Sequence, residues 1–167
     1  MNMQTLNDLF EHEIADLYDA ENQLVEALPK LAQAATNDEL RTAFEHHLEE
    51  TRDHVRRLEE IRGQIGTAMS ETCDGMKGLI AEGEETISAD GDPTVKDAAL
   101  ISAAQRVEHY EIAAYGTART LADELGLGDA KELLDQTLDE ESNADKLLTK
   151  IATGGMFGTG INEEAAR

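Results

Sequence analysis

The sequence is poor in the residues that build sheets and break helices. Its 167 residues include no tryptophan, only three phenylalanines, three tyrosines and two prolines. Alanine and leucine must therefore form the core, which suits closely packed helices better than a β-sandwich, and the scarcity of proline leaves room for long helices. A chain of this length is expected to form one domain with one sizeable core.

Cys73 is the only cysteine, so no disulfide can form within the chain and a reducing compartment is expected. Residues 1–9 have neither the basic start nor the apolar run of a secretory signal. No apolar run approaches the length of a membrane span. These absences predict a cytoplasmic protein that does not cross a membrane.

Basic residues are also scarce. Fourteen Lys and Arg stand against 36 Asp and Glu, which gives a net charge of −22. Nucleic acids and anionic membranes are bound through basic side chains, so neither is expected as a partner. Such a charge makes the compact state repel itself unless salt screens it. This favours a halophilic protein from a salt-rich cytoplasm, and the alternative is an ordinary acidic bacterial protein.

Apolar residues recur at steps of three and four in four long segments, a spacing typical of helices with one buried face. The predicted helices span residues 4–35, 38–65, 93–125 and 129–152. Residues 75–88 predict a short fifth helix across one end or side of the bundle. Gly66 suits a helix end, Pro93 a helix start and Asp129 an N-cap. The predicted domain is 1–152, followed by a mobile, glycine-containing tail over 153–167.

Ionisable side chains interrupt the apolar faces near the middle of all four long segments. They are Glu21 in the first, Glu50 and His54 in the second, Glu108 and Glu111 in the third, and Glu141 and Asp145 in the fourth. Removing an ionised carboxylate from water is costly unless it is paired or binds a metal. The intervals from Glu21 to Glu50 and from Glu111 to Glu141 are 29 and 30 residues. The two halves therefore resemble a repeated helical hairpin, and antiparallel packing would bring all these groups to one level.

Carboxylate-rich ligand sets with one or two imidazoles suit iron or manganese better than structural zinc or calcium. Bundle proteins with two metals take one Glu from each of two helices and a Glu-x-x-His motif from the others. Here the spacings are Glu50-x-x-x-His54 and Glu141-x-x-x-Asp145, so the match is imperfect.

The residues leave alternatives open for several of these side chains. Glu21 could extend to solvent from the boundary of its face, and Asp145 could be an exposed helix charge. Glu108 could pair with Arg106 or Arg119, and His54 could hydrogen-bond a carboxylate instead of binding metal. His47 and His109 are expected to orient carboxylates or to lie on the surface, and Cys73 is expected to be structural.

Four segments carry a resemblance to a known family: LYDAENQL (17–24), HLEETRDHVRRLE (47–59), DAALISAAQRVEHYEIAAYGTARTLADELG (97–126) and TLDEESNADKLL (137–148). The chain resembles the YciF/YciE-type bacterial ferritin-like stress proteins over roughly residues 3–152. The resemblance implies an all-α, ferritin-like four-helix bundle of two helical hairpins, with an additional short helix in the connection between the second and third long helices. It also implies a homodimer and a di-iron carboxylate centre.

Carried over by position, the resemblance implies that the ligands are Glu21, Glu50, Glu108, Glu111 and Glu141, and Asp145 is a weaker match. Relatives often have glutamine at the position of His54. The leading hypothesis is a metal-binding protein with two iron or manganese ions that acts on oxygen or peroxide in a stress response. The alternatives are non-catalytic iron binding or sequestration, and a structural or partner-binding bundle with a vestigial site. Whether the protein is an enzyme is left open.

Overall fold

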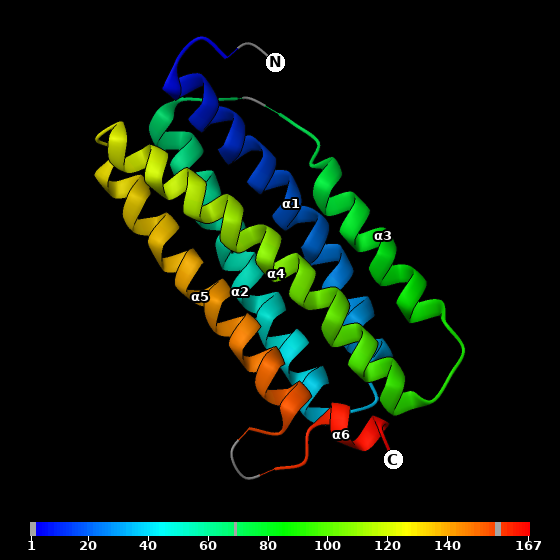
Figure 1. The fold of residues 1–167 in the computed structure, drawn as a ribbon. Helices are drawn as coiled ribbons and strands as arrows, with labels where there is room; N and C mark the ends of the chain where they lie inside the picture. Colours follow the sequence, from blue (N-terminus) through cyan, green and yellow to red (C-terminus); the bar gives the residue numbers. More distant parts are fainter. Residues whose placement is uncertain (1–2, 69, 156–157) are drawn as a thin grey trace.

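The computed structural model describes residues 3–68, 70–155 and 158–167. The predicted domain and the predicted tail each include a few residues outside these ranges. The described residues form six helices and no strand: α1 Leu6–Ala34, α2 Asp38–Ile65, α3 Asp74–Ser88, α4 Pro93–Glu124, α5 Gly128–Thr153 and α6 Ile161–Ala165. The four long helices α1, α2, α4 and α5 form an elongated bundle (Figure 1). The prediction of an all-α bundle of two helical hairpins is confirmed.

Helix ends follow the capping residues of the sequence at most positions. Thr5 caps α1, Asn37 caps α2, and Asp92 caps α4 just before Pro93. Gly66 ends α2 in the left-handed conformation (φ 68°), which glycine adopts without the steric cost of a side chain. These ends agree with the predicted ones.

The prediction that Asp129 is the N-cap of the fourth long helix is wrong. The turn after α4 is tight, because Gly126 is left-handed (φ 71°) and the Leu127 amide donates to the Ala122 carbonyl at 2.9 Å. The chain therefore enters α5 at Gly128, and Leu127 occupies the N-cap position with no side-chain hydrogen bond. Asp129 already lies in the first turn, where its charge complements the helix dipole instead of capping the helix.

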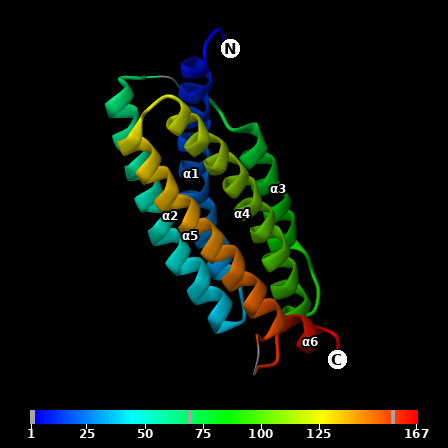
Figure 2. The same ribbon diagram turned by 60° about the vertical axis from the view of Figure 1, so that its left-hand side comes forward.

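The fifth helix, α3, is confirmed and runs along the outside of the bundle rather than across its end (Figures 1 and 2). It packs against α1 and α4. Lys30 of α1 and Glu84 of α3 form an ion pair of 2.7 Å at this contact. Met76 is the largest fully buried side chain of α3. None of the helices in the described ranges combines the length and the apolar character needed to cross a lipid bilayer.

The end of the chain folds back onto the bundle. The sequence predicts a mobile tail, whereas α6 packs against α4 and α5 and buries Ile161 in the core. Gly160 permits this return, since a Cβ atom there would lie 2.3 Å from the carbonyl carbon of Thr153. The packed structure therefore extends beyond the predicted boundary at residue 152.

The apolar core is divided into two clusters. One contains Leu24, Phe44, Leu100 and Ile151, among others, and the other contains Phe10, Leu58, Tyr115 and Leu134. In each long helix the members of one cluster precede those of the other, and buried ionisable or polar side chains lie at or next to the change from one cluster to the other. A buried polar layer thus separates two hydrophobic halves of one bundle.

Candidate metal centre

The polar layer contains two groups of side chains that converge on common points. One group is His47, Glu108, Glu111 and Glu141, and the other is Glu21, His54 and Glu141. Within each group one ligand atom per residue lies within 4.8 Å of all the others. All six side chains are at least 95% buried. All four long helices contribute, and Glu141 of α5 belongs to both groups.

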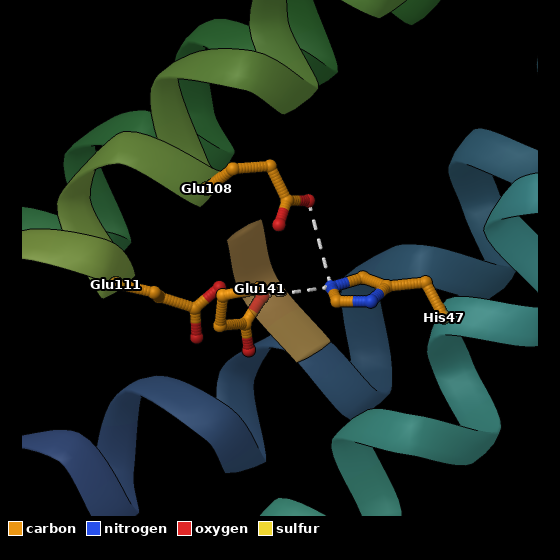
Figure 3. Close-up of side chains that lie close together, drawn as sticks. All are labelled: His47, Glu108, Glu111 and Glu141. Carbon is orange, nitrogen blue, oxygen red and sulfur yellow. Dashed lines mark ion pairs between the residues drawn. The ribbon is translucent and has the colours of Figure 1, made fainter. Parts of the chain in front are cut away.

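The first group lies between α2, α4 and α5 (Figure 3). His47 Nε2 is 3.5 Å from Glu108 Oε1 and 3.6 Å from Glu141 Oε2. Figure 3 shows that Glu108 and Glu111 both extend from α4 toward this point. Their spacing of three residues places them on one face of the helix, about one turn apart.

The second group is more tightly packed. His54 Nδ1 is 2.9 Å from Glu141 Oε1 and 3.2 Å from Glu21 Oε1. Tyr115 of α4 donates a 2.5 Å hydrogen bond to the same oxygen of Glu21. The rings of His47 and His54 lie 6.2 Å apart, although seven residues of helix correspond to about 10 Å of rise. The two imidazoles therefore lean toward each other around Glu141.

Most polar atoms that face these points have no hydrogen-bond partner among the described residues. They are Glu21 Oε2, His47 Nε2, His54 Nδ1, Glu108 Oε2, and both carboxylate oxygens of Glu111 and Glu141. A buried polar atom without a partner is costly, and native proteins contain few of them. So many in one place indicates that the layer is built for a ligand that accepts several oxygen and nitrogen donors at once.

The outer nitrogen of each histidine, by contrast, is held by a carboxylate. His47 Nδ1 is 3.4 Å from Glu50 Oε2, and His54 Nε2 is 2.9 Å from Glu140 Oε2. Arg57 in turn holds Glu140 through both of its terminal nitrogens. Histidines that bind metals in proteins almost always donate their other ring N–H in this way, because it fixes the tautomer and the ring orientation. Both imidazoles are arranged as such ligands.

Without a metal, the buried side chains of this layer have strongly shifted pKa values. Burial alone would lower the pKa of His47 and of His54, but the surrounding carboxylates raise them to about 10 and about 11. Burial raises the pKa of Glu108 and of Glu111 well above the ordinary value. Burial would also raise that of Glu141, but the two histidines reverse the shift and lower its pKa. Without metal, Glu141 is thus the carboxylate that the imidazolium charges neutralise best.

The donor set fits two divalent cations. Glu21, Glu108, Glu111 and Glu141 carry four negative charges when ionised, which two such ions would neutralise while both histidines are neutral. Four carboxylates with two imidazoles suit iron or manganese, and the shared position of Glu141 suits a ligand between two ions. No described lysine or arginine forms an ion pair with any of these four carboxylates.

The structure brings together five of the seven side chains that the sequence predicts as ligands: Glu21, His54, Glu108, Glu111 and Glu141. Glu50 and Asp145 lie outside both groups. Glu50 is 28% exposed, and its carboxylate contacts His46 and His47. Asp145 is 21% exposed, accepts a hydrogen bond from Gln105 and lies 3.4 Å from the exposed His109. Their roles as ligands remain predictions.

Helix geometry explains why Glu50 is displaced. At about 100° per residue, Glu50 lies roughly 60° around the helix from His47 and roughly 40° from His54. The buried residues Phe44 and Thr51 lie on the other side of His47. The inward face is therefore centred near His47, and Glu50 is at its edge.

Sequence reasoning missed the ligand position of His47 and the roles of Glu140 and Arg57, and it left Tyr115 as one of several tyrosines that could orient a carboxylate. His47, expected to orient carboxylates or to lie on the surface, has its Nε2 in the first group. Glu140, Arg57 and Tyr115 hold the ligands from outside. The position of His47 seven residues before His54 was the available signal. The alternative pairing of Glu108 is not seen, because Arg106 contacts Glu82 and Arg119 contacts Asp135.

Fold and layer together define a helical bundle of the ferritin-like kind with a buried carboxylate and histidine centre that could hold metal. The chain belongs to the family described as "Domain of unknown function (DUF892)", which it matches over residues 5–166. It is 47% identical over 154 residues to protein YciF of Escherichia coli K12, a match that covers 91% of this chain and 93% of that protein. The resemblance seen in the sequence is thereby confirmed.

Solved structures similar to this one include the following two. The crystal structure of the E. coli stress protein YciF superimposes with a TM-score of 0.83 at 45% identity, over 89% of this chain and 94% of that one. YcfI from Rhodopseudomonas palustris, described as a candidate structural protein, superimposes with a TM-score of 0.87 at 42% identity, over 90% and 97% of the two chains.

Proposed function

We propose that this protein holds two iron ions in the buried layer and uses them to act on oxygen or peroxide during stress, with manganese as the other candidate metal. The observation that carries the proposal is the pair of donor groups that share Glu141 and most of whose inward atoms form no hydrogen bond among the described residues. Two bound iron ions would supply a redox centre able to exchange electrons with a small oxidant.

The residues of the chain have distinct roles in this proposal. Glu141 belongs to both donor groups and would help to hold both ions, and His47 and His54 would each hold one. Tyr115 fixes one oxygen of Glu21 and leaves the other for metal. The apolar clusters on both sides of the layer exclude water and keep the carboxylates in place.

The stress role, the cytoplasmic location and a homodimeric assembly are parts of the same proposal. The stress role and the homodimer rest on the family, and the cytoplasmic location rests on the sequence. E. coli YciF, at 47% identity, is described as a stress protein. The mass of the protein in solution tests the dimer. Transcript or protein levels before and after peroxide treatment of the source cells test the stress role.

Metal loading tests the centre itself. Metal-free protein is titrated with ferrous iron without oxygen, and bound iron is measured after desalting. About two ions per chain are expected, and Glu141→Gln should reduce this to less than one, because both groups lose a shared ligand. Glu132→Gln makes the same change at an exposed position of α5 and should keep both ions. Fewer than one ion in the unchanged protein would overturn the proposal.

Turnover is a separate question. After loading, repeated additions of peroxide with an electron donor should give repeated oxidation and reduction of the iron absorbance. A single oxidation without further reaction would instead assign the protein to iron sequestration.

The second candidate is a structural bundle, favoured by the description of the R. palustris relative. In that case the two imidazolium groups and the carboxylates neutralise one another without metal. Glu111→Gln distinguishes the two functions. It should stabilise a metal-free structural protein by removing a buried charge, and it should weaken metal binding if the centre is occupied.

A further inference from the structure

A pocket connects the surface with the first donor group. It has a volume of about 110 Å³ and lies between α2 and α5. His47 and Glu108 form part of its wall, and His46, Glu50 and Ala144 lie around it. His47 and Glu108 are 95% and 97% buried, and each has a side-chain atom without a hydrogen-bond partner among the described residues. The pocket therefore ends at polar atoms that can receive a ligand.

A wide, shallow groove continues the pocket outward. It is lined by Asp38, Glu39 and Thr42 and shares Ala43, His46 and Leu147 with the pocket. No lysine or arginine is among the described residues that line either hollow. Asp38 is paired with Arg41, whereas Glu39 and Glu50 supply negative charge that no described lysine or arginine pairs with along this path. A cleft of one sign of charge concentrates ions of the opposite sign and speeds their capture.

Three side chains span the distance from solvent to the centre. The His46 side chain is 69% exposed, and its Nδ1 is 3.3 Å from Glu50 Oε2. The same oxygen of Glu50 is 3.4 Å from Nδ1 of the buried His47. His47 Nε2 then faces Glu108 and Glu141. Each step offers a nitrogen or carboxylate oxygen that a partly hydrated divalent cation can bind.

We propose that divalent cations reach the buried centre through this pocket, and that His46 and Glu50 form a transient binding site from which the ion passes to His47 and Glu108. This inference rests on the proposed function, because it needs a centre that binds metal. It gives Glu50 a role that agrees with its half-exposed position at the edge of the inward face. Two small residues, Ala43 and Ala144, line the pocket beside Glu50 and leave the path open.

The test separates the rate of loading from the final amount of metal bound. Metal-free protein is mixed rapidly with Co²⁺, whose absorption in the visible range reports binding, and the ions held at equilibrium are counted by elemental analysis. His46→Gln should slow loading about tenfold while two ions are still bound at the end. Glu50→Gln should slow loading as well, and because Glu50 also holds His47, only its loading rate is compared. Ala144→Leu, which narrows the pocket without removing a donor, should also slow loading.

Glu49→Gln is the matched control, because Glu49 is an exposed carboxylate next to Glu50 and pairs with Arg52. It should load at the unchanged rate. Circular dichroism of each metal-free variant confirms that the helices are intact.

The possible outcomes distinguish the two proposals. If the unchanged protein binds no Co²⁺, the proposed function fails. If it binds two ions but none of the variants loads more slowly, the access route is wrong and the centre stands. If His46→Gln loses one ion at equilibrium, His46 is a resident ligand and the transient role is overturned.

Discussion

A single hydroxyl connects the apolar core with the second donor group. Tyr115 is fully buried in one hydrophobic cluster, and its hydroxyl donates to Glu21 Oε1 at 2.5 Å. Burial raises the pKa of Tyr115 well above its ordinary value, so the hydroxyl stays protonated and can only donate to the carboxylate. It therefore fixes the orientation of the Glu21 carboxylate within the second donor group.

Tyr115→Phe should lower metal affinity by about 10- to 100-fold, the usual effect of removing a hydrogen-bond partner of a ligand. The substitution keeps the ring and removes only the hydroxyl. Competition with a coloured chelator measures the affinity. Tyr18→Phe is the control, because the Tyr18 hydroxyl donates to Glu59 in a partly exposed contact away from the centre. Equal affinities of both variants would show that Tyr115 does not orient Glu21.

The buried histidines predict an unusual pH dependence of the metal-free protein. The pKa values of His47 and His54 are about 10 and about 11, above the ordinary 6.5. A raised histidine pKa stabilises the fold fully below pH 6.5, and this contribution is lost as the pH rises toward those values. Glu108 and Glu111 act in the same direction, because their raised pKa values make ionisation in the fold costly above pH 4.5. The free energy of unfolding should therefore be lower at pH 9 than at pH 6, by at least about 1 kcal/mol.

Urea unfolding at the two pH values, with a chelator present, measures this difference. Metal should reverse it, since ligation requires neutral histidines and ionised carboxylates and releases protons. His109→Gln provides the control for loss of an exposed histidine, because His109 is 68% exposed and lies outside both donor groups. A metal-free protein that is more stable at pH 9 would refute the charge assignment.

At the scale of elements, the first turn of α3 approaches α4 closely at one glycine. A Cβ atom on Gly75 would lie 2.9 Å from Cε2 of the Tyr110 ring. That ring cannot move freely, because its hydroxyl donates to Asp16 at 2.8 Å and lies 2.9 Å from the buried Cys73 Sγ. Cys73 also occupies the N-cap position of α3. Gly75, Tyr110 and Cys73 thus form the joint between the added helix and the bundle.

Gly75→Ala should destabilise the protein by about 1–3 kcal/mol, the usual cost of forcing an extra methyl group into packed atoms. Gly78→Ala is the matched variant three residues later in α3, where nothing lies within 4 Å of the new Cβ atom. It should stabilise the protein by roughly 0.5–1 kcal/mol through helix propensity alone. Thermal unfolding compares the two, and equal shifts of the same sign would exclude the proposed joint.

The elements themselves could be predicted because their signals are local. Apolar spacing located the long helices, and Gly66 and Pro93 marked boundaries that the structure confirms. The prediction of Asp129 as an N-cap was wrong because the left-handed Gly126 shortens the turn before α5. A sequence does not show which glycine adopts that conformation. The return of α6 depends on long-range packing of Ile161, which local periodicity cannot reveal.

The centre could be predicted only in part, for a geometric reason. Periodicity places a residue on a face but does not locate the middle of that face. Glu21, Glu108, Glu111 and Glu141 lie near the middle and were found. Glu50 and His47 share one row, yet the packing of α4 and α5 buries His47 and leaves Glu50 at the edge. Contacts between helices such as Glu140 with His54 connect residues 86 positions apart and have no sequence signature.

At the scale of the whole molecule, the division of the core gives the metal a structural consequence. Two hydrophobic clusters lie on either side of a layer that is poorly satisfied without metal. Binding to the folded state alone stabilises it in proportion to the logarithm of ligand concentration over the dissociation constant. A loaded centre would therefore join the two halves of the bundle into one more stable unit.

The net charge of −22 acts on the whole molecule in the opposite direction. Repulsion among surface carboxylates destabilises the compact state. Salt screens this repulsion over a Debye length of about 3 Å at 1 M, compared with about 10 Å at 0.1 M. We predict that the melting temperature of the metal-free, chelated protein rises by several degrees between 0.1 M and 2 M KCl. Changing the exposed Glu45, Glu124 and Glu132 to glutamine should raise the melting temperature at 0.1 M KCl and reduce the further gain from salt. Differential scanning calorimetry measures both effects. A melting temperature that stays constant or falls with KCl would show that charge repulsion is compensated within the fold and would contradict the adaptation to salt that the composition predicts.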